Sequence, residues 1–107
     1  DYVHVWDIAS AHVKGAELIN NITDENTTAV AMIFNLGTNS GVSNKQIVDY
    51  VKERYGLPFV NYGPRRAGDP DELVADAHTA KELLDWEPRF SNIETIIDSA
   101  YKWYSSR

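Results

Sequence analysis

Residues 31–55, with the sequence AMIFNLGTNSGVSNKQIVDYVKERY, contain the signals that decide the fold class of the chain. Residues 31–36 are an apolar run of the length of a β-strand, and the small and polar residues 37–41 indicate a turn. A helix follows, because Ser43 and Gln46 have the spacing of a capping box, in which each side chain accepts from the other residue's backbone amide. The stretch therefore predicts a strand, a turn and a helix in succession, as in an α/β fold.

The rest of the chain predicts further helices and short extended segments. Three more helices are predicted, each beginning at a residue that caps helices well. The first runs from the Asp7 cap to Asn20 and Asn21, and a short one runs from the Asp76 cap to Leu84. The last begins at the capping box of Ser91 and Glu94 and continues through Tyr104. The helix after Ser43 is expected to stop at Gly56, and extended segments are expected at residues 2–5, 59–60 and 73–75. The prediction is one α/β domain, residues 1–107, in which helices pack on a few short strands.

The composition argues against several classes of function. The net charge is −6, whereas binding to nucleic acid or to an anionic membrane through counterion release needs a basic field. The chain has no cysteine and no apolar run of membrane-spanning length, and the spacing of His4, His12 and His78 does not resemble a metal site. We therefore expect no nucleic-acid partner, no membrane partner and no metal. An anionic ligand would need a local cluster of cations.

Arg65 and Arg66 form such a cluster in a loop that contains glycine and proline. A guanidinium can hold two phosphate oxygens at once, Gly68 would let the backbone approach a ligand closely, and Asp69 could accept from two neighbouring hydroxyl groups, as on a ribose. The alternative is a turn whose arginines pair with some of the chain's 16 carboxylates. From the loop alone, both interpretations stay open.

The sequence offers no set of residues for catalysis. Ser40 and Ser43 lie near glycines, but no histidine–aspartate pair can be placed beside them from the sequence. The strand predicted before Gly37 lacks the Gly-x-Gly-x-x-Gly spacing that brings a dinucleotide onto a helix N-terminus. His12 is expected to pack on its helix with a hydrogen bond to a backbone carbonyl. We assign no catalytic, cofactor-binding or metal-binding residue.

Several motifs together resemble the C-terminal part of the extended short-chain dehydrogenase/reductase family, and of its UDP-glucose 4-epimerases in particular. The motifs are DYVHVWD at residues 1–7, FNLGT at 34–38, GVS at 41–43, RRAGDP at 65–70, and AD at 75–76 followed by AKELLDW at 80–86. They occur in the family's order over nearly the whole chain. Asn39 and Asp85 stand where the family often has glycine, and both are expected to be tolerated because Asn and Asp can adopt the left-handed backbone conformation.

The resemblance implies both a fold and a function. It implies a small C-terminal substrate-binding domain, residues 1–107, cut before Asp1 from a longer protein whose N-terminal Rossmann domain binds NAD. The whole protein would be a cytoplasmic, homodimeric isomerase of galactose metabolism that interconverts UDP-glucose and UDP-galactose, and this part alone would be inactive. By family position, Arg66 would clasp the diphosphate and Asp69 a ribose hydroxyl. Tyr2 would line the nucleotide site, and Leu73 would gate the sugar pocket.

Some points stay open at this stage. Tyr50 and Tyr101 lack a lysine four positions on, so neither fits the family's catalytic Tyr-x-x-x-Lys motif. Leu73 is intermediate between the aromatic residue that favours plain hexoses and the small residue that admits N-acetylhexosamines, so the sugar preference is undecided. One alternative is another sugar-nucleotide epimerase or dehydratase of the family. The other is a free-standing module that binds nucleotide sugars without catalysis.

Overall fold

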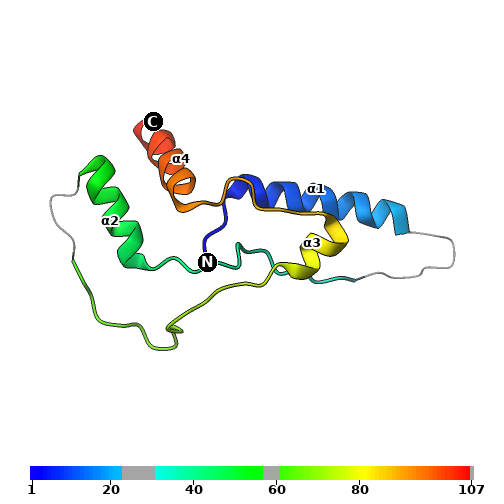
Figure 1. Cartoon of the computed structure of the whole chain (residues 1–107), viewed down its shortest axis with the longest axis horizontal. Coiled ribbons are helices and arrows are strands. Elements are labelled where there is room, and N and C mark those ends of the chain that lie inside the picture. Colours follow the sequence, from blue (N-terminus) through cyan, green and yellow to red (C-terminus); the bar gives the residue numbers. More distant parts are fainter. Residues whose placement is uncertain (23–30, 57–60, 107) are drawn as a thin grey trace.

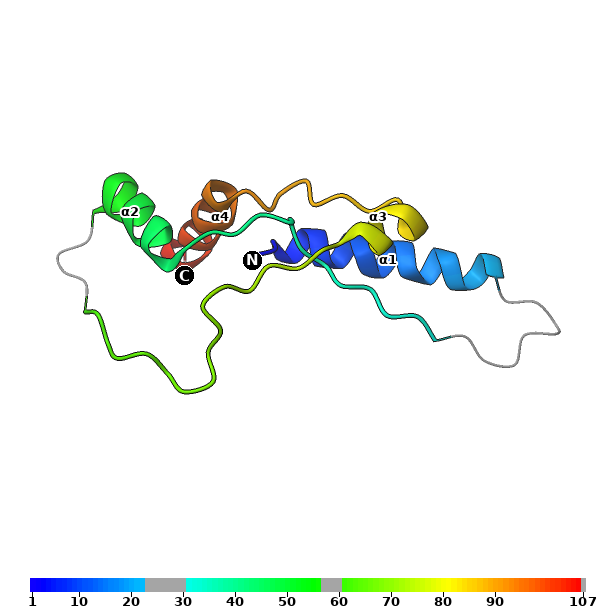
Figure 2. The same cartoon turned by 60° about the horizontal axis from the view of Figure 1, so that its bottom comes forward.

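The computed structural model describes residues 1–22, 31–56 and 61–106, and within them the chain forms four helices and no strand. The helices are α1 (Val5–Ile22), α2 (Asn44–Tyr55), α3 (His78–Leu84) and α4 (Ile93–Ser105). α1 packs against α3 and α2 packs against α4, and Figures 1 and 2 show these two pairs in different halves of an elongated chain, with the N-terminus between them. The radius of gyration is 17.9 Å. A compact domain of this length has about 13 Å, so the chain is open.

The predicted strands are wrong in the part of the chain that the structure describes. Residues 31–36 and 73–75 carry no strand, Val5 already belongs to α1, and residues 59–60 lie outside the described residues. A strand exists only when a neighbour pairs with its backbone, and residues 31–36 have no such partner among the described residues. Phe34 and Leu36 pack against the core from one side, whereas the other apolar side chains of the run are exposed. Ile33, for example, is 90% exposed. The expectation of helices packed on short strands is therefore incorrect, although helices of the expected number are present.

The core is small and lies between α1 and α3. Its buried apolar residues are Ala11, Ala80, Leu84 and Trp86. The indole Nε1 of Trp86, the largest of these, donates to the backbone carbonyl of Asp7 at 2.8 Å. Asp85 ends α3 in the left-handed conformation, with φ of 53°, and so turns the chain to place Trp86 over α1. Asn39 has φ of 56°, so left-handed backbone is confirmed at both positions where Asn or Asp replaces glycine.

Asp7 does not cap α1, because the helix begins earlier, at Val5. The carbonyl of His4 accepts from the amides of Asp7 and Ile8 at 2.9 and 3.2 Å, so these first-turn donors are already satisfied. The carboxylate of Asp7 is buried and accepts instead from the amides of Arg89 and Phe90, both at 2.9 Å. Asp7 therefore fixes the segment before α4 on the start of α1.

The caps of the two C-terminal helices are also shifted from their predicted residues. Ser91 is buried, and its hydroxyl accepts from the amide of His4 at 2.9 Å and donates to the carboxylate of Asp7. Asn92 caps α4 in its place, because its side chain accepts from the amide of Thr95 at 2.8 Å. For α3 the N-cap residue is Ala77, but the carboxylate of Asp76 still accepts from the amide of His78 at 3.0 Å. The predicted helices are thus present with different cap residues.

α2 keeps its predicted ends and is bound to α4 by a polar cluster. The capping box of Ser43 and Gln46 and the stop at Gly56 are both confirmed. Asp98 of α4 accepts from the hydroxyl of Tyr50 at 2.9 Å and from that of Tyr55. The bond from Tyr55 is the first cause that holds the pKa of Asp98 below its ordinary value. These contacts hold the C-terminal half of α2, while its first turn lies beside a cavity.

Candidate functional site

One cavity gathers all four residues that the sequence singled out for substrate binding. It has a volume of about 680 Å³ and is lined by Tyr2, by the first turn of α2, and by Arg66, Asp69 and Leu73 of the segment that leads to α3. Small-molecule sites in proteins are usually concave spaces of about 300–1,000 Å³. The chain thus has a space of the right size at the predicted place.

The arginine loop is organised by its own charges. Arg66 Nε donates to a carboxylate oxygen of Asp69 at 2.8 Å, and Gly68 takes a positive φ of 86° between them. Arg65 donates to the backbone carbonyl of Asp69 at 3.1 Å and forms an ion pair with Asp71. Arg65 therefore braces the turn. Arg66 has an 85% exposed side chain, and only its Nε is bonded within the described residues, so its two Nη groups remain for an anion.

Asp1 fixes the distance between two walls of the cavity. Its carboxylate accepts from the amide and the hydroxyl of Thr38 at 3.0 and 2.7 Å and from the amide of Ala75 at 3.1 Å. Gly37 allows this close approach, because a Cβ there would lie 2.6 Å from both Ala75 Cβ and Asp1 Oδ2. These bonds join three segments of the chain, and two of them carry Tyr2 and Leu73, which line the same cavity. Sequence reasoning missed Asp1, although it directly precedes the tyrosine of the first motif.

Asn44, the first residue of α2, is a second residue that the sequence did not reveal. Its Oδ1 accepts from the hydroxyl of Tyr2 at 2.8 Å. It lines the main cavity and also a neighbouring cavity of about 370 Å³ formed with the arginine loop. The bond joins residues far apart in the sequence, so no local pattern could have predicted it.

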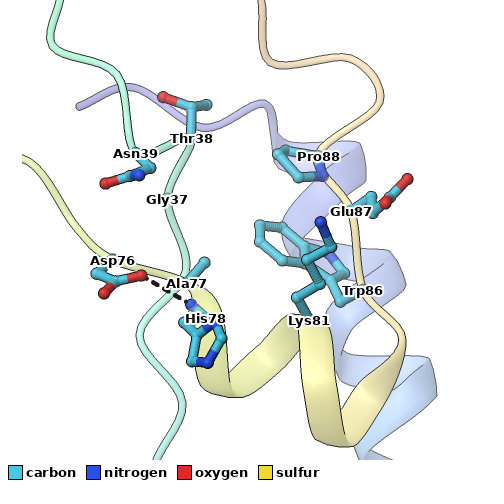
Figure 3. Close-up of a pocket in the computed structure, with 10 residues that line it drawn as sticks. All are labelled: Gly37, Thr38, Asn39, Asp76, Ala77, His78, Lys81, Trp86, Glu87 and Pro88. Atoms are coloured by element: carbon cyan, nitrogen blue, oxygen red, sulfur yellow. Dashed lines mark hydrogen bonds between the residues drawn. The ribbon is translucent and has the colours of Figure 1, made fainter.

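A separate pocket of about 480 Å³ lies between the turn at residues 37–39, α3 and the segment after α3. Figure 3 shows Lys81 extending from α3 toward the segment that carries Trp86 and Pro88, while Asp76 bonds the amide of His78. None of the predicted substrate-binding residues lines it. Its one lysine gives it no arginine fork for a diphosphate, and the main cavity is therefore the better candidate.

The histidines have structural contacts. His4 is buried and accepts from the amide of Trp6 on Nδ1 at 3.0 Å, which leaves Nε2 to donate to Ser99 Oγ at 3.0 Å. His12 donates to the carbonyl of Ile8 at 2.8 Å, so the predicted carbonyl bond is confirmed, although the residue is exposed. Within the residues that the structure describes, no cluster of His, Asp and Glu could hold a metal ion. No helix among them is long and apolar enough to cross a membrane.

Comparison with known proteins gives this geometry a context. No protein-family model matches the chain. The UDP-glucose 4-epimerase of Streptococcus mutans is 40% identical over 107 residues, which are 99% of this chain and 30% of that protein. The enzyme of the same name from Lactobacillus helveticus is 39% identical over 107 residues, 99% of this chain and 31% of that protein. A crystal structure of a UDP-glucose 4-epimerase matches with a TM-score of 0.84 and 40% identity, over 100% of this chain and 31% of that one.

The chain is similar to the C-terminal part of UDP-glucose 4-epimerases. It spans about three tenths of the length of the curated relatives that it matches. The resemblance inferred from the five motifs is therefore confirmed over the whole chain. The match to the solved epimerase also supports a domain of the short-chain dehydrogenase/reductase type, whereas the expected strands are not part of the described structure.

Proposed function

We propose that the chain is the part of an NAD-dependent UDP-glucose 4-epimerase that anchors the UDP moiety of the substrate. The observation that carries this proposal is the convergence of Tyr2, Arg66, Asp69 and Leu73 on one cavity of about 680 Å³. These residues come from segments more than sixty positions apart in the sequence, so their meeting is a property of the fold. The relatives named above support the 4-epimerase over another sugar-nucleotide epimerase or dehydratase.

Each residue has a role that fits its position. The Nη groups of Arg66 would take oxygens of the diphosphate, because a guanidinium binds two of them in a fixed geometry. Asp69 would then exchange its bond to Arg66 for a ribose hydroxyl. Tyr2 would form a wall of the nucleotide site. Leu73 is 73% exposed, so it is accessible to the sugar that it would gate.

Strong binding of UDP suits a 4-epimerase for a mechanistic reason. The reaction inverts one carbon of the hexose, so the sugar must present either face to the reacting group in turn. The sugar must therefore be held loosely while another part of the substrate supplies the binding energy. A charged loop that holds the diphosphate can provide such an anchor.

NAD has no fitting site among the residues that the structure describes. No described helix follows a strand through a glycine-rich turn, which is the arrangement that cradles a dinucleotide pyrophosphate. When bound, NAD would supply hydride transfer at C4 of the hexose. We propose that it is bound outside this chain, by an N-terminal Rossmann domain of the whole protein. The chain's own part is then limited to holding and positioning the substrate.

The test compares the whole protein with residues 1–107 alone. The whole protein should convert UDP-galactose to UDP-glucose and bind UDP in calorimetry. The isolated chain should not catalyse this conversion and should not bind NAD tightly. Epimerase turnover by the isolated chain would contradict the division of roles. Binding of UDP by the whole protein without any epimerisation would favour a nucleotide-sugar binding module.

Two further properties of the whole protein are part of the proposal. It would be a homodimer, which sedimentation at several concentrations would test. It would be located in the cytoplasm, which fractionation of the cells that make it would test. The absence of cysteine is compatible with a reducing compartment.

A further inference from the structure

Asn44 lies at the junction of the two cavities beside the arginine loop. It lines the cavity of about 680 Å³ that contains Tyr2 and Leu73, and also the neighbouring cavity of about 370 Å³ that the arginine loop forms. Arg66 and Asp69 line both cavities as well. A ligand that occupies either cavity and binds Arg66 therefore shares that cavity with the side chain of Asn44.

The contact with Tyr2 sets the direction of the Asn44 amide. Because Oδ1 accepts from the hydroxyl of Tyr2 at 2.8 Å, the rotation of the amide is set and the Nδ2 amino group is not engaged by that hydroxyl. In the residues that the structure describes, Nδ2 makes no hydrogen bond. The backbone of Asn44 is also held, because Ser43 and Gln46 close the capping box around it. A fixed side chain with unused donors is preorganised for a ligand.

The charges of the cavity indicate which ligand atoms need those donors. The lining contains the carboxylates of Asp1, Asp69, Asp71 and Glu72, and its one cationic side chain is that of Arg66. A diphosphate has more oxygens than one guanidinium can satisfy, and the surrounding carboxylates can only accept. Asn44 lines the same two cavities as Arg66 and can supply N–H donors there without adding charge.

We propose that Asn44 is a further substrate-binding residue, whose Nδ2 donates to a phosphate oxygen of the nucleoside diphosphate held by Arg66. This inference rests on the proposed function and adds a residue to the same site. Tyr2 has a second role in it, because its hydroxyl holds the amide in the orientation that presents Nδ2 to the phosphate.

The experiment measures the affinity of the whole protein for UDP and for uridine, in three variants. Asn44→Ala removes the donor and should weaken UDP binding about tenfold, as expected for a lost hydrogen bond to a charged group. Asn44→Asp keeps an acceptor for Tyr2 but places an oxygen where the donor was. It should weaken UDP binding at least as much, because a carboxylate then faces the phosphate. Tyr2→Phe should cause a smaller loss than Asn44→Ala, since Nδ2 remains.

Uridine and thermal stability provide the controls. Uridine has no diphosphate, so its affinity should be the same for Asn44→Ala and the wild type. Asp is favourable in the first turn of a helix, so Asn44→Asp should retain the melting temperature of the wild type. If this variant binds UDP as well as the wild type does, Asn44 serves only to position Tyr2 and the inference is wrong. An equal loss for uridine and UDP would place the acceptor on the nucleoside and also overturn it. Failure of the wild-type protein to bind UDP would instead refute the proposed function itself.

Discussion

Replacing Arg66 with alanine should reduce UDP affinity strongly and change stability little. The bond between Arg66 Nε and Asp69 Oδ2 is 2.8 Å long, but the Arg66 side chain is 85% exposed. Exposed ion pairs contribute about 0–1 kcal/mol to folding. The free energy of unfolding of Arg66→Ala should therefore lie within about 1 kcal/mol of the wild-type value.

The expected loss of affinity follows from two opposing contributions. Losing a charge-assisted contact to a bound ligand costs about 2–4 kcal/mol. In the wild type, however, Asp69 must give up part of its bond to Arg66 when UDP binds, at a cost of up to about 1 kcal/mol that the variant does not have. The net loss is about 1–4 kcal/mol, which is roughly five- to a thousandfold in the dissociation constant.

Calorimetric titration of UDP into the whole protein measures this loss, with Arg65→Ala as the matched control. Arg65 lies in the same loop but is engaged by Asp71 and by the carbonyl of Asp69, so its removal should weaken binding less. The UDP affinity of Arg66→Lys should lie between those of the wild type and Arg66→Ala, because lysine keeps the charge but lacks the planar guanidinium fork. An Arg66→Ala affinity within about twofold of the wild type, less than the smallest expected loss, would refute the assignment. A larger loss for Arg65→Ala would mean that the loop is right and the arginine is wrong.

Three further predictions concern the sugar pocket, the helix contact and the core. Leu73→Ser should raise the activity on UDP-N-acetylglucosamine relative to UDP-glucose, and Leu73→Tyr should lower it. Identical activity ratios in the wild type and both variants would contradict the role of Leu73 as a gate of the sugar pocket. The bond from Tyr55 lowers the pKa of Asp98 in the folded chain. The ionised Asp98 should therefore stabilise the fold fully above its pKa in the unfolded chain, about 4, and this stabilisation should be lost as the pH falls through the lower pKa of the folded chain. Urea unfolding between about pH 6 and pH 3 should therefore show less acid destabilisation in Asp98→Asn than in the wild type, and equal slopes would exclude this contribution. Trp86→Phe removes the donor to the carbonyl of Asp7 and should cost about 1–3 kcal/mol in urea unfolding, whereas an unchanged midpoint would show that the bond does not stabilise the core.

The sequence by itself determined those features whose interactions lie within a few residues. The capping box of Ser43 and Gln46 closes within one helical turn, and the bond between Arg66 and Asp69 lies within one loop. The left-handed conformation of Asp85 depends on its own backbone and on the end of α3. The family motifs likewise could be recognised from the order of residues alone, and the comparisons confirm that resemblance.

Only the tertiary structure decided the features that depend on residues far away in the chain. The carboxylate of Asp7 was expected to cap its own helix, but it bonds amides 82 and 83 positions later, because the first-turn donors of α1 are satisfied by His4. Residues 31–36 have the apolar composition of a strand, but pairing needs a neighbouring backbone that composition cannot supply. The contact between Tyr2 and Asn44 spans 42 positions. Such contacts form only when folding brings the two segments together, so their geometry cannot be obtained from local residue patterns.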